Sequence, residues 1–225
     1  VDSLRAIKRA MEAFAERGWE TELIVCNNNS TDRTADLAAA EGVKVVFEPI
    51  NQISRARNAG AAAATGDWLI FVDADSFPGR ELFADTAIAI ESGRYLAGGA
   101  TVRLDEGPFG ARCFAAGWSS LSRLMKWAAG SFIFCRADAF RAVGGFSTEL
   151  FASEEIDLSI KLKRLARTEG KRLVILNKHP LITSGRKLKL YSRRDHLRLF
   201  IRALFRPFAT VKNREACGFW YDGRR

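Results

Sequence analysis

The stretch Trp68-Leu-Ile-Phe-Val-Asp73-Ala-Asp75 has the pattern of a buried strand that ends in two carboxylates. Its apolar residues are continuous rather than alternating, as in parallel strands that are covered on both faces of a sheet. In an extended chain, residues two apart share a face, so Asp73 and Asp75 project to the same side. Open α/β sheets bind ligands at the carboxyl ends of their strands. The stretch therefore predicts an α/β fold with a functional site at this strand end.

The two carboxylates also predict a binding site for a divalent metal ion. Asp73 and Asp75 repel one another unless a cation lies between them, and a hard divalent ion with oxygen ligands fits this role. The usual further ligands of such an ion are phosphate oxygens of a substrate. The alternative interpretation is a polar strand end that caps the next helix. The pair of acids by itself leaves both interpretations open.

Strand-like and helix-like runs alternate on both sides of this strand. The alternation predicts an α/β domain with a mostly parallel central sheet. Such a domain normally opens with a strand, whereas this chain opens with apolar residues at helical spacing, so we expect a first strand ahead of Val1. The predicted strands are residues 22–26, 43–47, 67–72, 95–104, 131–135 and 173–176, and the predicted helices are residues 4–14, 31–40, 52–64, 109–128, 136–143 and 153–168.

The length of 225 residues and the composition indicate one globular domain. Apolar residues make up 48% and charged residues 27%, which excludes global disorder. No run approaches the ~18 consecutive apolar residues of a transmembrane helix. The four cysteines form no CxxC pair, and with two histidines they give no zinc-ligand pattern. Because Cys26 and Cys135 each end an apolar run, we interpret them as buried thiols of a protein from a reducing, cytoplasmic compartment.

The positive charge of the chain is concentrated near its C-terminus. Residues 186–214 contain ten Lys or Arg and one acid, Asp195, so this segment carries +9, which equals the net charge of the whole chain. We therefore expect one domain over residues 1–185 and a basic extension over residues 186–225 that packs on it. Charge confined to one segment argues against a nucleic-acid binder and favours phosphates or an anionic membrane surface as the partner.

A helix is predicted over residues 193–206, where apolar residues share one arc and four arginines form a stripe beside it. Two interpretations stay open. The helix packs on the domain with a solvated basic edge, or it lies on an anionic membrane where a lipid-linked acceptor is presented. The second interpretation places the protein peripherally on the inner face of the membrane. The four arginines are Arg194, Arg198, Arg202 and Arg206.

A polar turn follows the predicted strand at residues 22–26. Its members Asn27, Asn28 and Asn29 offer short amides and backbone N–H groups that could hold a nucleotide base or ribose. An ordinary Asx-rich turn explains the same residues. Arg57, on the following Ala-rich helix, could pair with phosphate, or it could be solvated like most arginines on such a helix. Neither feature identifies a ligand by itself.

Five stretches in this order resemble the family 2 glycosyltransferases. The resemblance implies a GT-A fold, which is a Rossmann-like sandwich, and inverting transfer of a sugar from a nucleotide-diphospho-sugar donor to an acceptor hydroxyl with Mg²⁺ or Mn²⁺. It implies an enzyme of the hexosyltransferase type. No QxxRW-type motif of the processive polysaccharide synthases occurs, so we expect transfer of a single sugar. The matching stretches are IVCNNNSTDRT (24–34), SRARNAGAAAATGDWLIFVDAD (54–75), the apolar run after Gly130, GGF (144–146) and SEEIDLSIKLKR (153–164).

The resemblance also implies roles for individual residues. Asp75, with Asp73, would hold the metal ion on the donor diphosphate. Asn27 and Asn28 stand where the family has aspartates near the nucleotide. His179 would be a further metal ligand, unless this lone histidine has a structural role. Arg186 could close over the phosphates, or be one more member of the basic segment.

Glu155 stands where the family has its catalytic base, which takes the proton of the acceptor hydroxyl. If Ser153 caps the predicted helix, Glu155 lines up with an apolar stripe that faces the domain, and Glu154 falls beside this stripe. The alternative is that Glu154 and Glu155 only complement the helix dipole. The stripe consists of Leu158, Leu162 and Ala166.

Two other functions compete with glycosyl transfer. A sugar-phosphate nucleotidyltransferase also joins a nucleotide to a sugar on an α/β sheet, but its Gly-rich phosphate loop with a lysine is not visible in this sequence. A non-catalytic module that docks through the basic segment has no need for clustered carboxylates. Mg²⁺- or Mn²⁺-dependent hydrolysis of a panel of nucleotide sugars separates the three.

Overall fold

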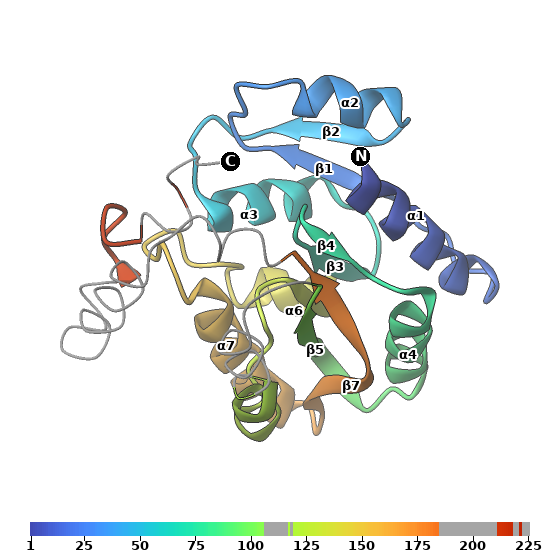
Figure 1. Ribbon diagram of the computed structural model, residues 1–225. Helices are drawn as coiled ribbons and strands as arrows, with labels where there is room; N and C mark the ends of the chain where they lie inside the picture. Colours follow the sequence, from blue (N-terminus) through green and yellow to red (C-terminus); the bar gives the residue numbers. More distant parts are fainter. Residues whose placement is uncertain (106–116, 118, 185–210, 218–220, 222–225) are drawn as a thin grey trace.

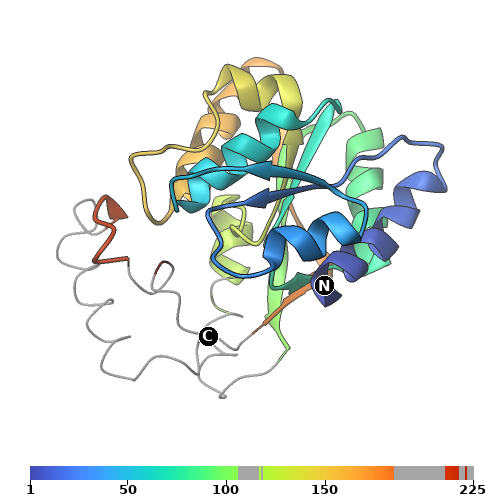
Figure 2. The ribbon, with the colours of Figure 1, turned by 90° about the horizontal axis from the view of Figure 1, so that it is seen from above.

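The computed structural model describes residues 1–105, 117, 119–184, 211–217 and 221. Figures 1 and 2 show strands at the centre, with α1 and α4 on one side and α3, α6 and α7 on the other. The helices are α1 (Asp2–Ala15), α2 (Thr34–Ala40), α3 (Ile53–Ala63), α4 (Arg80–Glu91), α6 (Ala137–Ala142) and α7 (Glu154–Thr168), and residues 119–125 are also helical. The strands are β1 (Ile24–Asn27), β2 (Lys44–Phe47), β3 (Trp68–Val72), β4 (Ser76–Phe77), β5 (Tyr95–Leu104), β6 (Phe132–Arg136) and β7 (Arg172–Thr183).

The strands form two sheets, and the larger one is mixed. Strands β1 and β2 pair in parallel, and the five-stranded sheet has the order β3-β6-β5-β7-β4. Only β5 and β7 are parallel in it, whereas β3–β6, β6–β5 and β7–β4 are antiparallel. The predicted α/β fold is confirmed, and the mostly parallel central sheet is corrected to a mixed one. Burial on both faces gives a continuous apolar run in either direction, so the pattern did not reveal that β6 runs against its neighbours.

The strand that the sequence predicts ahead of Val1 would pair along an edge of a sheet, and the edges in question are those of β1 and β3. Strand β1 pairs with β2, and β3 pairs with β6. Within the described part of the chain, no strand pairs with the other edge of either. A strand ahead of Val1 stays a prediction.

Two apolar layers lie on opposite faces of the larger sheet, because alternate residues of a strand point to opposite faces. Ile133 and Cys135 of β6 pack with the layer beneath α6 and α7. Phe132 and Phe134 pack with the layer beneath α1 and α4. All four side chains are at most 2% exposed, so β6 contributes buried residues to both layers of the core.

Gly98 in β5 approaches its neighbours so closely that a side chain would not fit. A Cβ atom there would lie 2.5 Å from the ring of Phe134 and 2.6 Å from the carbonyl oxygen of Val174. We expect Gly98→Ala to lower the free energy of unfolding by roughly 1–3 kcal/mol, because the strands must shift to admit a methyl group. Urea denaturation measures this change.

Gly60→Ala is the matched control for that substitution. Gly60 lies within α3, and no atom outside its own helix backbone lies within 4 Å of its Cβ position. Alanine in a helix is favoured over glycine by ~0.5–1 kcal/mol, so this variant should be slightly more stable than the wild type. Equal stability of the two variants would contradict the close packing at Gly98.

The structure shows how deeply the two cysteines that end apolar runs are buried. Cys135 is buried, whereas Cys26 is only half-buried, like every residue of β1, so the prediction of two buried thiols is corrected for Cys26. Burial raises the pKa of both thiols.

Among the residues that the structure describes, no helix combines the length and apolar content that a membrane crossing requires.

Candidate active site

Arg57 of α3 joins three segments that are far apart in the sequence. One nitrogen of its guanidinium, Nη1, donates to Glu154 Oε1 at 2.8 Å. The other, Nη2, donates to Asp73 Oδ1 at 2.9 Å and to the Gly130 carbonyl at 2.8 Å. The carbon of the guanidinium lies 5.2 Å from the centroid of the Phe146 ring. The end of β3, the start of β6 and the first turn of α7 therefore meet at one arginine.

The ion pairs at Arg57 differ in their exposure to solvent. The side chains of Arg57 and Glu154 are 11% and 5% exposed, whereas that of Asp73 is 40% exposed. Although burial opposes its charge, Asp73 and Glu154 raise the pKa of Arg57, so the guanidinium stays charged. The Arg57–Glu154 pair is therefore the buried part of the site, and Asp73 is the part that solvent reaches.

Glu155 lies beside this cluster. Its carboxyl carbon is 3.6 Å from the position that a Cβ of Gly130 would take, and Arg57 Nη2 is 3.3 Å from the same position. Burial, and then the negative charge of Glu154, raise the pKa of Glu155 to about 7, while Arg57 opposes this shift. A carboxyl group that gains and loses a proton near neutral pH suits general acid–base chemistry.

The raised pKa of Glu155 predicts how stability depends on pH. The folded protein holds the proton of Glu155 up to pH ~7, whereas the unfolded chain releases it near the ordinary value of 4.5. The folded state therefore binds more protons between these values, so this group lowers stability as pH rises through that window. We expect the melting temperature of the wild type to fall relative to that of Glu155→Gln between pH 5 and pH 8. Parallel curves for the two proteins would contradict the raised pKa.

The first turn of α7 departs from the prediction in two ways. Ser153 occupies the N-cap position, but it has a left-handed backbone (φ 64°) and its side chain makes no capping hydrogen bond. Glu154 is the more buried glutamate, at 4% exposure, whereas Glu155 is half-buried. The prediction had placed Glu155 in line with the apolar stripe and Glu154 beside it. The correction follows from Arg57, whose charge compensates a carboxylate at the buried position.

Asp73 and Asp75 lie directly beyond the end of β3. The N–H of Asp73 donates to the Ser131 carbonyl at 3.3 Å, and the Ser184 N–H donates to the Asp75 carbonyl at 3.1 Å. These bonds fix the turn between β3, β6 and the end of β7. The described residues include no cluster of three or more His, Cys, Asp or Glu arranged to hold a metal ion. Two carboxylates still fit Mg²⁺ or Mn²⁺, because such ions are commonly held by one or two carboxylates together with substrate phosphates.

The asparagine turn after β1 holds a neighbouring loop. Asn28 Nδ2 donates to the carbonyls of Ile50 and Glu48 at 2.6 and 3.2 Å, and Asn28 Oδ1 accepts the Gln52 N–H at 2.9 Å. Asn27 Oδ1 accepts the Ser30 N–H at 2.9 Å. Asn29 has a left-handed backbone (φ 56°). Both ends of the Asn28 amide thus bond the backbone of a distant loop, and only the Asn27–Ser30 bond is the local Asx-type contact that the sequence also allowed.

Two predicted site residues lie elsewhere. His179 Nδ1 is 2.9 Å from Asp85 Oδ2 of α4. The structure therefore pairs this histidine with Asp85 and does not bring it into the cluster at Arg57. Arg186 lies outside the described residues, as do the predicted helix at residues 193–206 and most of the basic segment. The predicted helix at residues 109–128 is described only in part, as a helix over residues 119–125.

Two amide side chains that sequence reasoning missed anchor the loop before α7. Gln52 is 2% exposed, and its Nε2 donates to the carbonyls of Thr148 and Leu150 at 2.9 Å each. Asn58 bonds both the N–H and the carbonyl of Phe146. The only signal in the sequence was the presence of two amides on an otherwise Ala-rich helix. Through them, α3 positions the segment that leads into Glu154.

Two residues near the C-terminus, Val211 and Tyr221, contact the loop before α7. The Phe151 N–H donates to the Val211 carbonyl at 2.7 Å. The ring of Tyr221 lies edge-on to Phe151, at 5.7 Å between centroids, and its hydroxyl accepts the Ile53 N–H at 3.4 Å. These residues pack on the domain, while the predicted boundary at residue 185 stays a prediction.

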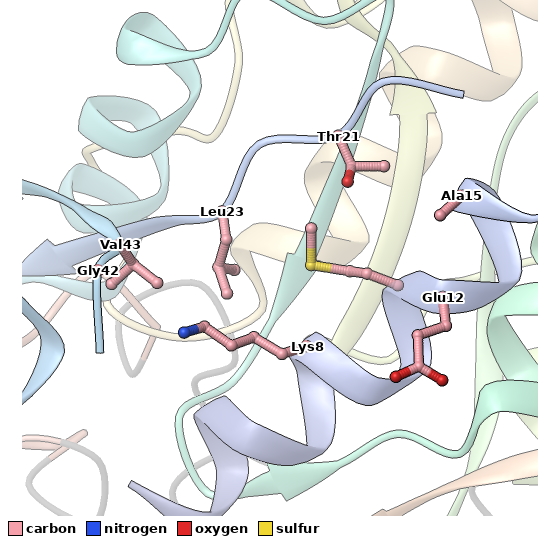
Figure 3. A pocket seen from close by; sticks show the side chains of 8 residues that line it. Lys8, Glu12, Ala15, Thr21, Leu23, Gly42 and Val43 are labelled. Carbon is pink, nitrogen blue, oxygen red and sulfur yellow. The ribbon is translucent and has the colours of Figure 1, made fainter. Parts of the chain in front are cut away.

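An open pocket of about 340 Å³ lies away from the cluster at Arg57, between α1 and the β1–β2 sheet. Figure 3 shows Lys8 and Glu12 of α1 on one side and Leu23 and Val43 on the other. None of the residues that line it contacts Arg57. The lining residues are Lys8, Met11, Glu12, Ala15, Thr21, Leu23, Gly42 and Val43.

A mixed sheet covered by helices on both faces is the architecture of the GT-A fold, which the chain shares with solved structures. The chain belongs to the glycosyl transferase family 2, whose model matches residues 3–136. A protein of Mycobacterium bovis described as an uncharacterized glycosyltransferase is 46% identical over 74 residues, which are 33% of this chain and 31% of that protein. The match thus spans less than a third of this relative's length.

Solved structures show the same fold at low sequence identity. The mannosyltransferase PcManGT of Pyrobaculum calidifontis, in complex with GDP-Man and Mn²⁺, has a TM-score of 0.61 and 19% identity, and the match covers 97% of this chain and 70% of that one. S. aureus TarS 1–349 has a TM-score of 0.60 and 17% identity, with 90% of this chain and 62% of that chain covered. The GT-A fold that the sequence predicted is confirmed.

Proposed function

We propose that the protein transfers a single hexose from a nucleotide-diphospho-sugar to an acceptor hydroxyl, with inversion at the anomeric carbon. Family membership supports transfer of a sugar. PcManGT is known in complex with GDP-Man and Mn²⁺, and TarS in complex with UDP-GlcNAc, which supports a nucleotide-sugar donor. The observation that carries the proposal is Glu155, a carboxyl group with a pKa of about 7 beside the cluster of Arg57, Asp73 and Glu154.

Glu155 acts as the general base in this proposal. Its carboxylate accepts the proton of the acceptor hydroxyl as that oxygen forms a bond to the anomeric carbon, while the bond from this carbon to the diphosphate breaks. A single displacement of this kind inverts the configuration. A pKa of about 7 leaves a substantial fraction of Glu155 ionised at neutral pH and still makes it a useful proton acceptor.

Asp75, assisted by Asp73, would hold a Mg²⁺ or Mn²⁺ ion at the end of β3. When bound, such an ion would neutralise the charge that develops on the leaving diphosphate. Asp73 is also held by Arg57, so its carboxylate is fixed before any ligand arrives. Asp75 follows it at the turn whose backbone is bonded to Ser184. Two oxygen donors of this kind leave room for phosphate oxygens to complete the coordination.

The nucleotide is proposed to lie at the turn of Asn27, Asn28 and Asn29, where Asn28 orders residues 48–52. Arg186 is proposed to close over the phosphates. The acceptor is a hydroxyl compound, and the basic segment at residues 186–214 favours one that is lipid-linked and reached at an anionic membrane surface. This arrangement would place the protein at the inner face of the membrane.

A panel of nucleotide sugars tests the proposal. We expect release of nucleoside diphosphate from at least one nucleotide sugar with Mg²⁺ or Mn²⁺, and loss of that activity when EDTA is added. Formation of a nucleotide sugar from a nucleoside triphosphate and a sugar phosphate would instead support the nucleotidyltransferase alternative. Binding of nucleotide sugars without turnover under any metal would support the non-catalytic module.

A further inference from the structure

Arg57 is placed to hold the two sides of the site in one fixed relation. Its Nη2 bonds Asp73 at the end of β3, and its Nη1 bonds Glu154 at the start of α7. We propose that Arg57 is a positioning residue, which fixes the donor-side carboxylate and the base-bearing helix relative to one another and does not bind the donor phosphates. The proposal rests on the function proposed above, because it assigns Asp73 to the donor side and Glu155 to the acceptor side.

The hydrogen-bonding capacity of Arg57 is largely used within the protein. Both terminal nitrogens are engaged, with three acceptors at 2.8–2.9 Å, and the side chain is only 11% exposed. The Phe146 ring lies 5.2 Å from the guanidinium carbon. A phosphate would have to displace Asp73 or Glu154 to reach it. Displacement would leave a carboxylate without its partner, and for the buried Glu154 this is costly.

The charges around Arg57 also disfavour an anionic ligand there. Asp73 and Glu154 pair with the guanidinium, and Glu155 is a third acid whose pKa Arg57 influences. One positive charge therefore faces three acidic groups. A diphosphate that approached Arg57 would meet net negative charge when these acids are ionised, whereas a cation at the strand end would be attracted.

The planar fork of an arginine explains why this residue type is suited to the role. It presents its N–H groups in a fixed plane, so the directions of two bonded partners are fixed together, whereas a lysine ammonium is a single point charge. Glu154 is the first residue of α7, and Glu155 follows it directly. When Arg57 holds Glu154, the backbone that carries Glu155 is held as well.

Because Gly130 has no side chain, there is room beside it for the guanidinium group of Arg57. The Gly130 carbonyl accepts from Nη2, and a Cβ at this position would lie 3.3 Å from the same nitrogen. A contact this short requires the neighbour to give way by a few tenths of an ångström. Gly130→Ala therefore displaces the guanidinium while every charge of the site is kept, and it tests position separately from charge.

The test compares Arg57→Lys and Gly130→Ala with the wild type. We expect kcat for sugar transfer to fall by up to about 10²-fold in Arg57→Lys, and by a smaller factor in Gly130→Ala, because small misplacements at a reacting centre have effects of this size. Calorimetry in the presence of Mn²⁺ gives the affinities for a nucleoside and its diphosphate. We expect the ratio of these two affinities to stay within about threefold of the wild type, since no charge-assisted phosphate bond is lost.

Arg136→Lys is the matched control. Arg136 forms a two-pronged pair with Glu169, just beyond the opposite end of α7, at 2.9 and 3.0 Å. This variant loses an arginine fork that holds the same helix, and we expect kcat close to that of the wild type. A similar loss of kcat in Arg136→Lys would mean that general loosening of α7 explains the effect, and it would overturn the specific role of Arg57.

Two further results would overturn the proposal. The first is a fall in the diphosphate-to-nucleoside affinity ratio in Arg57→Lys, which would make Arg57 a phosphate ligand. The second is an unchanged kcat in both Arg57→Lys and Gly130→Ala. The affinity ratio needs no turnover, so it remains informative if the wild type transfers no sugar and the proposed function fails. A non-additive effect of Arg57→Lys and Glu154→Gln on the melting temperature supports the pairing independently of substrate, and additive effects contradict it.

Discussion

Glu155→Gln is expected to lower kcat for sugar transfer by roughly 10²-fold or more, with the affinity for the nucleotide-sugar donor nearly unchanged. The amide has the size of the carboxyl group but cannot take the proton of the acceptor hydroxyl. In the wild type, kcat should fall as pH drops below about 7, because Glu155 becomes protonated there. Steady-state rates from pH 5.5 to 8.5, with donor affinity measured by calorimetry, check both statements.

Glu154→Gln is the control for this variant, since it removes the neighbouring carboxylate. Glu154 is 4% exposed and bonded to Arg57 at 2.8 Å, so its loss should lower the free energy of unfolding by roughly 1–3 kcal/mol. The glutamine oxygen can still accept from Arg57, so kcat of the folded enzyme should fall much less than in Glu155→Gln. If the two variants lose turnover equally, or if Glu154→Gln loses more, the assignment of Glu155 as the base is wrong.

The sequence predicted the elements of the fold better than their directions. The run before Asp73 was expected as a strand over residues 67–72 and is β3, Trp68–Val72, because a continuous apolar run next to a polar turn is a local pattern. The antiparallel pairing of β6 with β3 and with β5 is set by contacts between residues far apart in the sequence, and the local pattern of apolar residues does not reveal it. Family resemblance supplied the GT-A fold that periodicity alone did not.

The same distinction holds at the candidate site. The carboxylates at the end of β3 were found from the strand pattern, whereas Glu155 at the start of α7 came from the resemblance to the family, and the helical period served only to place it on a face. The more buried position of Glu154 was not, because it depends on Arg57, which lies 97 residues away in the sequence. Arg57 itself was interpreted as a phosphate ligand or a solvated residue. Only the folded chain shows three acceptors around it, and a helical wheel contains no information about them.

Asp75→Asn is expected to remove the divalent-metal-dependent activity, with a loss of roughly 10²-fold or more, and to leave the fold intact. Asparagine keeps the size of the side chain and the backbone bond from Ser184 to residue 75, but it lacks the charge that holds a hard cation. Activity across a Mn²⁺ titration from EDTA-treated enzyme, together with the melting temperature, measures both effects.

Asp73 is not used for this test, because its carboxylate pairs with Arg57 and its removal would change the stability of the cluster. Asp67→Asn is the matched control, because Asp67 is an exposed carboxylate immediately before β3, at the end remote from the site. It should keep the activity and metal dependence of the wild type. Full activity of Asp75→Asn at every Mn²⁺ concentration would show that the carboxylate at this strand end holds no metal, and the charge on the leaving diphosphate would then have to be balanced by cationic side chains.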